Sequence, residues 1–179
     1  HTAYRRQRQM CIRDRIGRYI TSTGMPEHAN YPEKYQAKFT GSASQAKALR
    51  ADQVSWADVD KLREIWPGKL VIKGIMRADD ARRAIDHGVD GIVVSNHGGR
   101  NMDSAPSTLD VLPGIATAVG DRTTIFVDSG VRRGSDIVKC LALGANAVLT
   151  GRATLYGIGA GGEAGAGKAL SILKNEMRR

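Results

Sequence analysis

Apolar and polar positions alternate in blocks from residue 55 onward, and each block has the length of one strand or one helix. Short apolar runs that predict strands are LVIKGI (70–75), GIVVSN (91–96), TIFVDSG (124–130) and NAVLTGR (146–152). Stretches with amphipathic helical spacing follow them at 78–88, 107–120, 134–144 and 166–179. A helix is also predicted before the first strand, at 55–66, where Ser55 and Asp58 have the spacing of a capping box.

The regular alternation of strands and helices implies parallel strands joined by right-handed crossovers. The strands are apolar on both faces, as in sheets covered by helices. Two architectures fit this pattern: half of a (β/α)8 barrel, or an open doubly wound sheet. Polar residues stand at the carboxyl end of every strand, namely Lys73, Ser95 with His97, Asp128 and Arg152. A half-barrel explains contributions from four successive strands better, and we predict it.

The chain divides into three regions by composition. Residues 1–54 lack long apolar runs and are rich in Gly, Ser, Pro, Tyr and charged residues. Within them we separate a basic arm at 1–19, expected to be disordered or of foreign origin, from an irregular loop region at 20–54. The predicted half-barrel occupies residues 55–179.

Charge is concentrated in the arm. The net charge is +9, and residues 1–19 hold six arginines against one acidic residue, whereas the remaining chain holds 21 basic and 17 acidic side chains. A solvated tail explains this distribution best; an acidic or anionic lipid surface is an alternative, and we expect no nucleic acid partner. Cys11 and Cys140 lack metal or redox spacing, so we expect no metal site, a buried Cys140 and a reducing cytoplasm.

The stretch SNHGGR (95–100) has the composition of a catalytic turn. His97 offers an imidazole that can act as a base, Gly98 and Gly99 leave the backbone accessible, and Arg100 can bind a carboxylate or a phosphate. A base beside a carboxylate clamp suggests proton abstraction from a small acid. An isolated loop histidine is more often structural, and Lys73 in the preceding strand could equally reach solvent or a neighbouring carboxylate.

Two later turns have the composition of a phosphate cradle. DSGVRRG (128–134) joins a strand to a helix, so its N–H groups lie at a helix start, and Arg132 or Arg133 adds charge. TGR (150–152) repeats the pattern after the next strand, and adjacent loops of this kind hold phosphate in barrels. A plain surface turn is the alternative. The glycine run GIGAGG (157–162) follows no suitable strand, and we assign it no site.

Taken together, IKG, SNHGGR, DSGVRRG and TGR resemble the FMN-dependent 2-hydroxy acid dehydrogenase and oxidase family, which includes glycolate oxidase, L-lactate dehydrogenase and mandelate dehydrogenase. The resemblance covers roughly residues 20–179 in matching order. It implies the C-terminal half of a (β/α)8 barrel, with His97 as the base, Arg100 on the substrate carboxylate, and Lys73 beside flavin N1 and the C2 carbonyl.

The same resemblance implies the remaining cofactor contacts. Ser95 approaches the flavin ring and Asp128 the ribityl chain of FMN, while the phosphate is held by Gly130, Arg132, Gly151 and Arg152. The expected reaction is oxidation of an L-2-hydroxy acid of the lactate or mandelate type, with a quinone, a cytochrome or oxygen as electron acceptor. Full-length members are homo-oligomeric. A cytoplasmic location, peripheral at the inner face of the membrane, is expected from similarity of residues 23–35 to membrane-associated members.

Three departures from the family pattern stand out. Ser129 replaces a usual glycine, which would cost on the order of 1 kcal/mol if the backbone there needs a positive φ. Ala153 replaces a usual proline. The first four strands of a barrel are absent and the chain begins at His1, so we expect a fragment that binds FMN weakly and turns over poorly. The alternatives are another FMN- or phosphate-binding barrel without hydroxy acid activity, or a basic binding protein.

Overall fold

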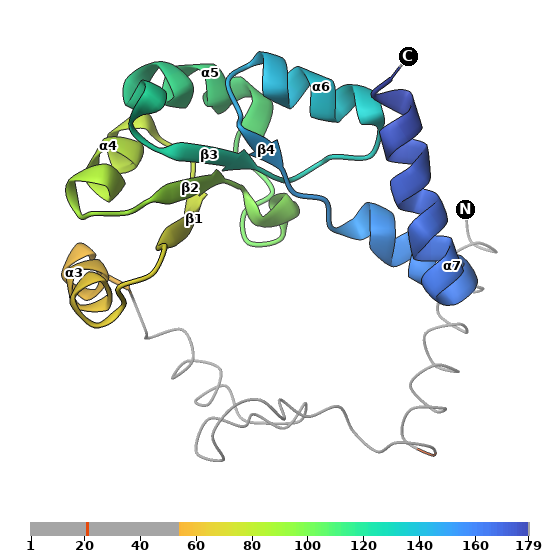
Figure 1. Cartoon of the computed structure of the whole chain (residues 1–179), viewed down its shortest axis with the longest axis horizontal. Helices are drawn as coiled ribbons and strands as arrows, with labels where there is room; N and C mark the ends of the chain where they lie inside the picture. Colours follow the sequence, from red (N-terminus) through yellow and green to blue (C-terminus); the bar gives the residue numbers. More distant parts are fainter. Residues whose placement is uncertain (1–20, 22–53, 179) are drawn as a thin grey trace. The chain divides into compact units, whose positions relative to one another are not determined.

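The computed structural model describes residue 21 and residues 54–178 (Figure 1). The predictions for the arm at 1–19 and for most of the loop region at 20–54 therefore lie outside the described residues. From Ser55 onward the chain forms one compact unit.

Four strands and five helices make up the described unit, together with two short 3-10 turns. The strands are β1 (Val71–Ile75), β2 (Gly91–Val94), β3 (Thr124–Val127) and β4 (Ala147–Val148). The helices are α3 (Trp56–Ile65), α4 (Ala78–Asp86), α5 (Thr108–Val119), α6 (Gly134–Ala142) and α7 (Arg152–Glu176). The 3-10 turns are η2 (His97–Gly99) and η3 (Gly120–Arg122).

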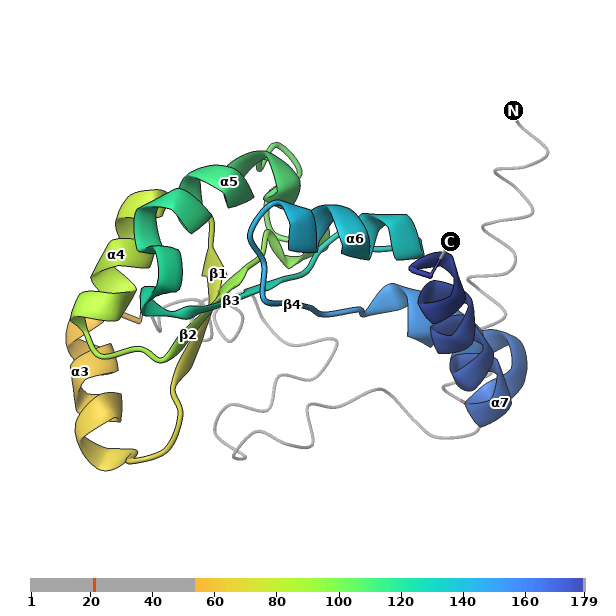
Figure 2. The same cartoon turned by 45° about the horizontal axis from the view of Figure 1, so that its top comes forward.

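The four strands form one parallel sheet in the order β1-β2-β3-β4. Helices α4, α5 and α6 all lie on the same face of this sheet (Figures 1 and 2). A doubly wound sheet would carry helices on both faces and reverse its strand order, whereas a barrel winds in one direction with its helices outside. The architecture is therefore part of a (β/α)8 barrel, and the predicted half-barrel is confirmed.

The core lies between the sheet and these three helices. Alternate residues of β2 and β3 point into it, among them Ile92, Val94, Ile125 and Val127, all at most 2% exposed. Leu112 and Ile115 of α5 pack against them. Cys140 of α6 belongs to the same cluster, and burial raises the pKa of its thiol, which confirms the prediction of a buried cysteine.

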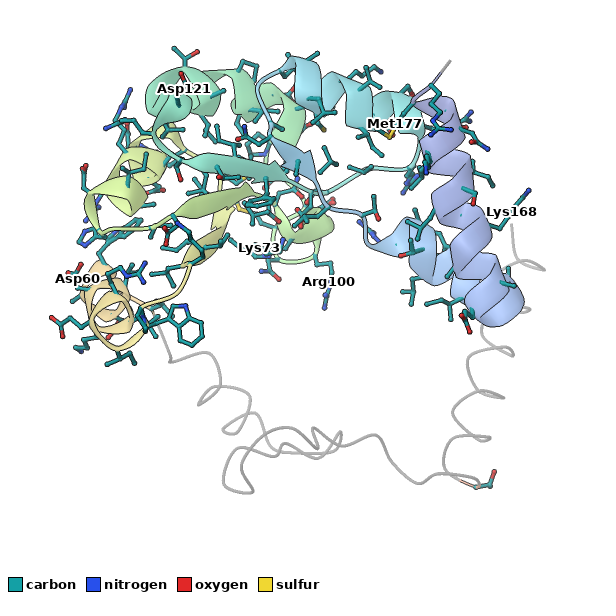
Figure 3. All side chains as sticks on the ribbon, in the orientation of Figure 1. Asp60, Lys73, Arg100, Asp121, Lys168 and Met177 are labelled. Atoms are coloured by element: carbon teal, nitrogen blue, oxygen red, sulfur yellow. The ribbon has the colours of Figure 1, made fainter. Side chains whose placement is uncertain are left out.

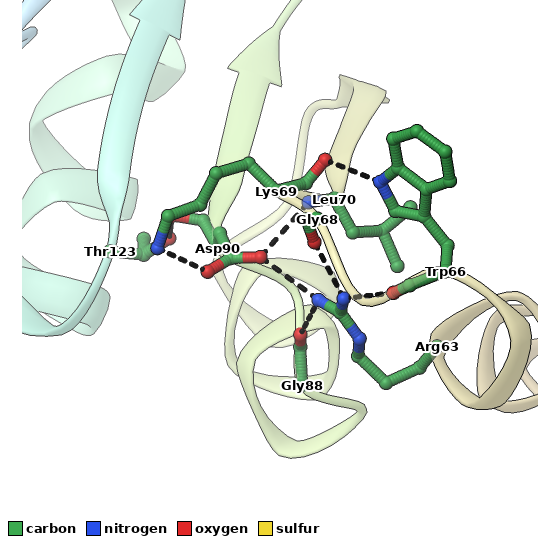
Figure 4. A network of polar contacts seen from close by, with 8 residues as sticks. All are labelled: Arg63, Trp66, Gly68, Lys69, Leu70, Gly88, Asp90 and Thr123. Atoms are coloured by element: carbon green, nitrogen blue, oxygen red, sulfur yellow. Dashed lines mark hydrogen bonds and ion pairs between the residues drawn. The ribbon is translucent and has the colours of Figure 1, made fainter.

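A polar network ties the opposite, amino-terminal end of the strands to α3 (Figure 4). The Asp90 carboxylate accepts hydrogen bonds from Arg63 at 2.9 Å, from Lys69 at 2.8 Å and from the backbone N–H of Leu70 at 2.9 Å. The hydrogen bonds from Lys69 and Leu70 lead in lowering the pKa of Asp90 to about 2, with burial opposing them. This carboxylate fixes the amino-terminal ends of β1 and β2. The polar residues predicted for the site lie at the other, carboxyl ends of the strands.

The capping box at Ser55 and Asp58 is confirmed. Pro113 lies inside the continuous helix α5, which follows the predicted range 107–120 closely. The prediction for 146–152 was too long, because only Ala147 and Val148 pair with β3.

The final helix also differs from its prediction at 166–179, because α7 begins at Arg152 and is interrupted by non-helical backbone at Gly161 and Gly162. Part of the glycine run that we had assigned to no element is therefore helical.

Candidate active site

The ends of β1, β2 and β3 bring Lys73, Ser95 and Asp128 into direct contact. The Lys73 ammonium donates a hydrogen bond to Ser95 Oγ at 2.7 Å and forms a short ion pair with Asp128 Oδ2. Ser95 is 1% exposed, while the Lys73 and Asp128 side chains are 46% and 20% exposed. The Lys73 ammonium and the Asp128 carboxylate thus pair at the carboxyl end of the sheet, next to the buried Ser95 hydroxyl.

Asp128 is held in its ionised form. Burial is the largest influence and by itself would raise the pKa of this carboxyl. Hydrogen bonds from Lys73, Ser95 and Ser129, with the charge of Lys73, together outweigh burial and bring the pKa below its ordinary value. The pair therefore carries one positive and one negative charge at neutral pH.

His97 lies in a turn whose backbone is fixed by its neighbours. Its φ is 56°, a left-handed conformation that is uncommon outside glycine. Its N–H donates to Ser95 Oγ at 3.1 Å, and the next N–H, from Gly98, donates to Asn96 Oδ1 at 3.0 Å. A Cβ on Gly74 would lie 3.2 Å from His97 Nε2, so the imidazole sits against the backbone of β1 next to Lys73.

Gly74 is also where β1 departs from regular pairing. The register between β1 and β2 shifts between Lys73 and Ile75, and Gly74 has a φ of +102°. Bulges of this kind re-aim a side chain at the end of a strand. Lys73 still pairs with Val93, so the bulge lies at Gly74, directly after Lys73 and against the His97 imidazole.

Arg100 follows the η2 turn and is exposed. Figure 3 shows its side chain extending away from the η2 ribbon, on the side of the sheet opposite α5. Within residues 54–178 its guanidinium has no hydrogen-bond or ion-pair partner. The structure thus leaves this charge available to an anion from outside.

The two glycine–arginine turns share one pocket of about 400 Å3. Gly130, Arg132, Gly151 and Arg152 all line it. A Cβ added at Gly130 or Gly151 would meet nothing within 4 Å, so their backbone is open to the space in front of it. Apolar side chains close the remainder, including Leu149, Tyr156 and Ile172.

The two candidate arginines of DSGVRRG, Arg132 and Arg133, have different surroundings in the structure. Arg133 forms an ion pair with Glu176 at 2.7 Å, and this carboxylate raises the pKa of Arg133. Arg132 instead lines the pocket. The charge at position 133 therefore fastens α6 to α7, whereas Arg132, the arginine that the family resemblance assigns to the phosphate, faces the pocket.

The turn that bears His97 adjoins the pocket. Arg152 Nη2 donates to the carbonyl oxygen of Gly98 at 3.2 Å, and a Cβ on Gly98 would lie 2.5 Å from that same nitrogen. Glycine at 98 therefore permits the close approach of Arg152. One hydrogen bond thus joins the turn that bears His97 to the pocket lined by Arg152.

Sequence reasoning missed several residues of this arrangement. Asn96 holds the turn through its side chain, and Tyr156 lines the pocket. The asparagine two residues before the glycine pair was a usable signal, because such side chains cap turns. Tyr156 was missed because the final helix was predicted to begin only at residue 166.

Ser129 was noticed in the sequence only as a replacement for glycine. Its φ is 74°, so the condition for strain at this position is met. Its hydroxyl also makes two hydrogen bonds that glycine lacks, to Asp128 Oδ1 at 2.8 Å and from the Gly98 N–H at 3.1 Å.

Comparison with known proteins points to one family. The family model described as FMN-dependent dehydrogenase matches residues 2–179. The chain is 52% identical over 120 residues to pre-mycofactocin synthase of Mycobacterium tuberculosis, covering 67% of this chain and 30% of that protein. It is 42% identical over 181 residues to L-lactate dehydrogenase of Xanthomonas campestris pv. campestris, covering 99% of this chain and 47% of the relative.

A solved structure of a soluble mutant of the membrane-associated (S)-mandelate dehydrogenase from Pseudomonas putida aligns with a TM-score of 0.66 at 48% identity. The alignment covers 73% of this chain and 38% of that one. The fold, the strand-end site and these similarities together place the chain in the FMN-dependent dehydrogenase family, whose resemblance the motifs had indicated. The chain spans less than half the length of each of these relatives.

The described residues contain no group of side chains able to hold a metal ion. None of the helices between residues 54 and 178 combines the length and the apolar character that a bilayer crossing needs.

Proposed function

We propose that this chain carries the catalytic part of an FMN-dependent enzyme that oxidises an L-2-hydroxy acid of the lactate or mandelate type to the 2-oxo acid. The observation that carries the proposal is the convergence at one end of the sheet. A histidine, a cation–carboxylate pair and two glycine–arginine turns come from four successive strand ends and are linked by hydrogen bonds. The names of the relatives, which include a lactate dehydrogenase and a mandelate dehydrogenase, support the substrate class.

The residues of the pocket suit FMN. Two guanidinium groups, from Arg132 and Arg152, and the open backbone at Gly130 and Gly151 form a donor set for a phosphate dianion. Lys73, Ser95 and Asp128 offer charged and hydroxyl groups for the ribityl chain and the polar edge of the ring. When bound, FMN supplies the two-electron acceptor for the oxidation.

The chain's own side chains supply binding and proton transfer. Arg100, which has no partner within residues 54–178, binds the carboxylate of the hydroxy acid through paired N–H donors. The alcohol loses two protons and two electrons as it becomes a ketone; His97 accepts one proton, and the electron pair and the other proton leave for the bound flavin. Lys73 places a positive charge where negative charge accumulates, and Asp128 holds the ammonium in position.

The proposal extends to acceptor and location. The electrons pass on from the flavin to a quinone, a cytochrome or oxygen. A cytoplasmic protein at the inner face of the membrane is consistent with the membrane-associated mandelate dehydrogenase, and the enzyme would be peripheral there.

The test is anaerobic bleaching of FMN. The 179-residue chain is loaded with excess FMN and is then mixed with L-lactate or (S)-mandelate. We expect loss of the visible flavin absorbance with an L-hydroxy acid and none with its D-enantiomer. An Arg100→Met variant should raise the substrate KM at least 10-fold, because a charge-assisted carboxylate contact is lost. Bound FMN that no hydroxy acid reduces would refute the proposal in favour of a phosphate-binding barrel without this activity.

A further inference from the structure

We propose that Ser129 is a positioning residue that couples the Lys73–Asp128 ion pair to the turn bearing His97. This inference rests on the proposed function for its catalytic meaning, because His97 is the base there. The coupling itself is a property of the chain and is measurable without substrate.

Ser129 and His97 share an unusual backbone. They are the two non-glycine residues with positive φ among residues 54–178, at 74° and 56°. They stand in the turns that follow β3 and β2. Left-handed backbone outside glycine persists where the surrounding structure over-determines it, and it concentrates at functional sites. Two such turns side by side therefore suggest that contacts between them hold both in place.

The Ser129 hydroxyl is that contact. It donates its proton to Asp128 Oδ1 at 2.8 Å, so its lone pairs are left to accept, and the Gly98 N–H donates to it at 3.1 Å. Asp128 Oδ2 is the oxygen that pairs with Lys73. A continuous polar path therefore runs from the Lys73 ammonium through Asp128 and Ser129 to the residue after His97.

A second link runs from Lys73 through Ser95 Oγ to the His97 N–H and holds the start of the turn. The other contacts of Gly98 do not replace the path through Ser129. Gly98 N–H also donates to Asn96 Oδ1 at 3.0 Å, but Asn96 belongs to the same turn and shapes it only locally. Arg152 holds the Gly98 carbonyl at 3.2 Å, and that guanidinium belongs to the anion pocket. Among the hydrogen bonds of Gly98, only the one to Ser129 connects the turn to Asp128, the carboxylate that orients Lys73.

Substitution of Ser129 by alanine or by glycine distinguishes the effect of the hydroxyl from the effect of the strained backbone. Ser129→Ala keeps the Cβ at positive φ and removes the hydroxyl, whereas Ser129→Gly removes both. If Ser129 positions the turn, both variants should loosen it. If Ser129 is only a strained substitute for glycine, Ser129→Gly should behave like the parent or better.

The first readout is hydrogen exchange of the Gly98 amide, followed by NMR in the isotope-labelled 179-residue chain without FMN. We expect exchange about 10-fold faster in both variants, with the amides of Ile92 and Ile125 in the core unchanged. The matched control is Ser171→Ala, which removes a serine hydroxyl that donates to Gly167 on the surface of α7. Ser129→Gly keeps the test valid if Ser129→Ala does not fold. Unchanged Gly98 exchange in the folded variants would overturn the proposal.

The second readout uses the chain loaded with FMN. The limiting rate of flavin reduction should fall about 10-fold in both Ser129 variants while the KM for the hydroxy acid stays constant, because Arg100 is untouched and only the base is misplaced. A parallel rise in KM, or a parent-like rate in Ser129→Gly, would count against positioning. If the parent chain binds FMN but no hydroxy acid reduces it, the proposed function fails, and the amide exchange still decides the role of Ser129.

Discussion

Replacement of Lys73 by methionine tests the electrostatics of the site. Methionine keeps the length of the side chain and removes its charge, so Asp128 loses its ion-pair partner while staying where it is. The Lys73 and Asp128 side chains are 46% and 20% exposed, which places the pair between a surface ion pair and a buried one. Surface pairs contribute about 0.5 kcal/mol and truncation of a buried pair costs about 3–5 kcal/mol, so we expect a loss of about 1–2 kcal/mol at neutral pH.

The loss should depend on pH in a definite direction. The folded-state pKa of Asp128 is lowered, so the pair stabilises the fold above the unfolded pKa of about 4, and this contribution is lost as the pH falls. In Lys73→Met burial remains without its main opposing hydrogen bond, so the pKa of Asp128 rises. The stability difference between parent and variant should therefore be largest near pH 7 and should shrink by more than half near pH 3.

Urea denaturation followed by circular dichroism at several pH values measures this difference. Lys61→Met is the matched control, since Lys61 pairs with Asp58 at 3.3 Å and its side chain is 73% exposed. No measurable change in stability is expected there. An equal loss at both ends of the pH range in Lys73→Met would show that lost packing, not the charge pair, explains the effect.

The remaining predictions concern packing and the far end of the strands. Leu112→Ala, at a fully buried position of α5, should lower the free energy of unfolding by about 3 kcal/mol in urea. Gly134→Ala would place its Cβ 2.5 Å from that of Glu176, so α6 and α7 must separate, and we expect a loss of about 2 kcal/mol in the same assay. Asp90→Asn should lower the urea midpoint at neutral pH, and this difference should shrink as the pH falls toward the Asp90 pKa of about 2, because the parent loses the same charge. Differences that stay constant with pH at Asp90, or full stability in Gly134→Ala, would contradict these assignments.

The alternation of apolar blocks predicted the architecture correctly because the length and spacing of each block suit only one kind of secondary structure. Runs such as GIVV are too short for helices and too apolar for loops, and the intervening segments have helical spacing. The sequence also predicted which residues stand at strand ends, since parallel strands bring all their carboxyl ends to one edge. Contact between Lys73 and Asp128, which lie 55 positions apart, follows from that topology.

The first part of α7 was not predicted. We assigned the glycine run from 157 to 162 no site, and we predicted a helix only from residue 166 onward. In the structure, a Cβ on Gly157 would lie 2.5 Å from the Gly165 carbonyl oxygen, so these glycines allow the two legs of α7 to pack closely. Tertiary contact of this kind leaves no local pattern. The same limitation applies to Ser129, whose hydrogen bond to Gly98 joins turns 31 residues apart.

If the strand ends form one catalytic site with His97 as its base, removal of the imidazole should largely stop the reaction. The most direct measurement is the rate constant for anaerobic reduction of FMN by the hydroxy acid in His97→Asn, compared with the parent chain and with His87→Asn. His87 pairs with Asp60 and stacks on Trp56, away from the strand-end site. We predict a fall of about 100-fold or more in His97→Asn and a parent-like rate in His87→Asn. A His97→Asn chain that still reduces FMN at the parent rate would contradict the account.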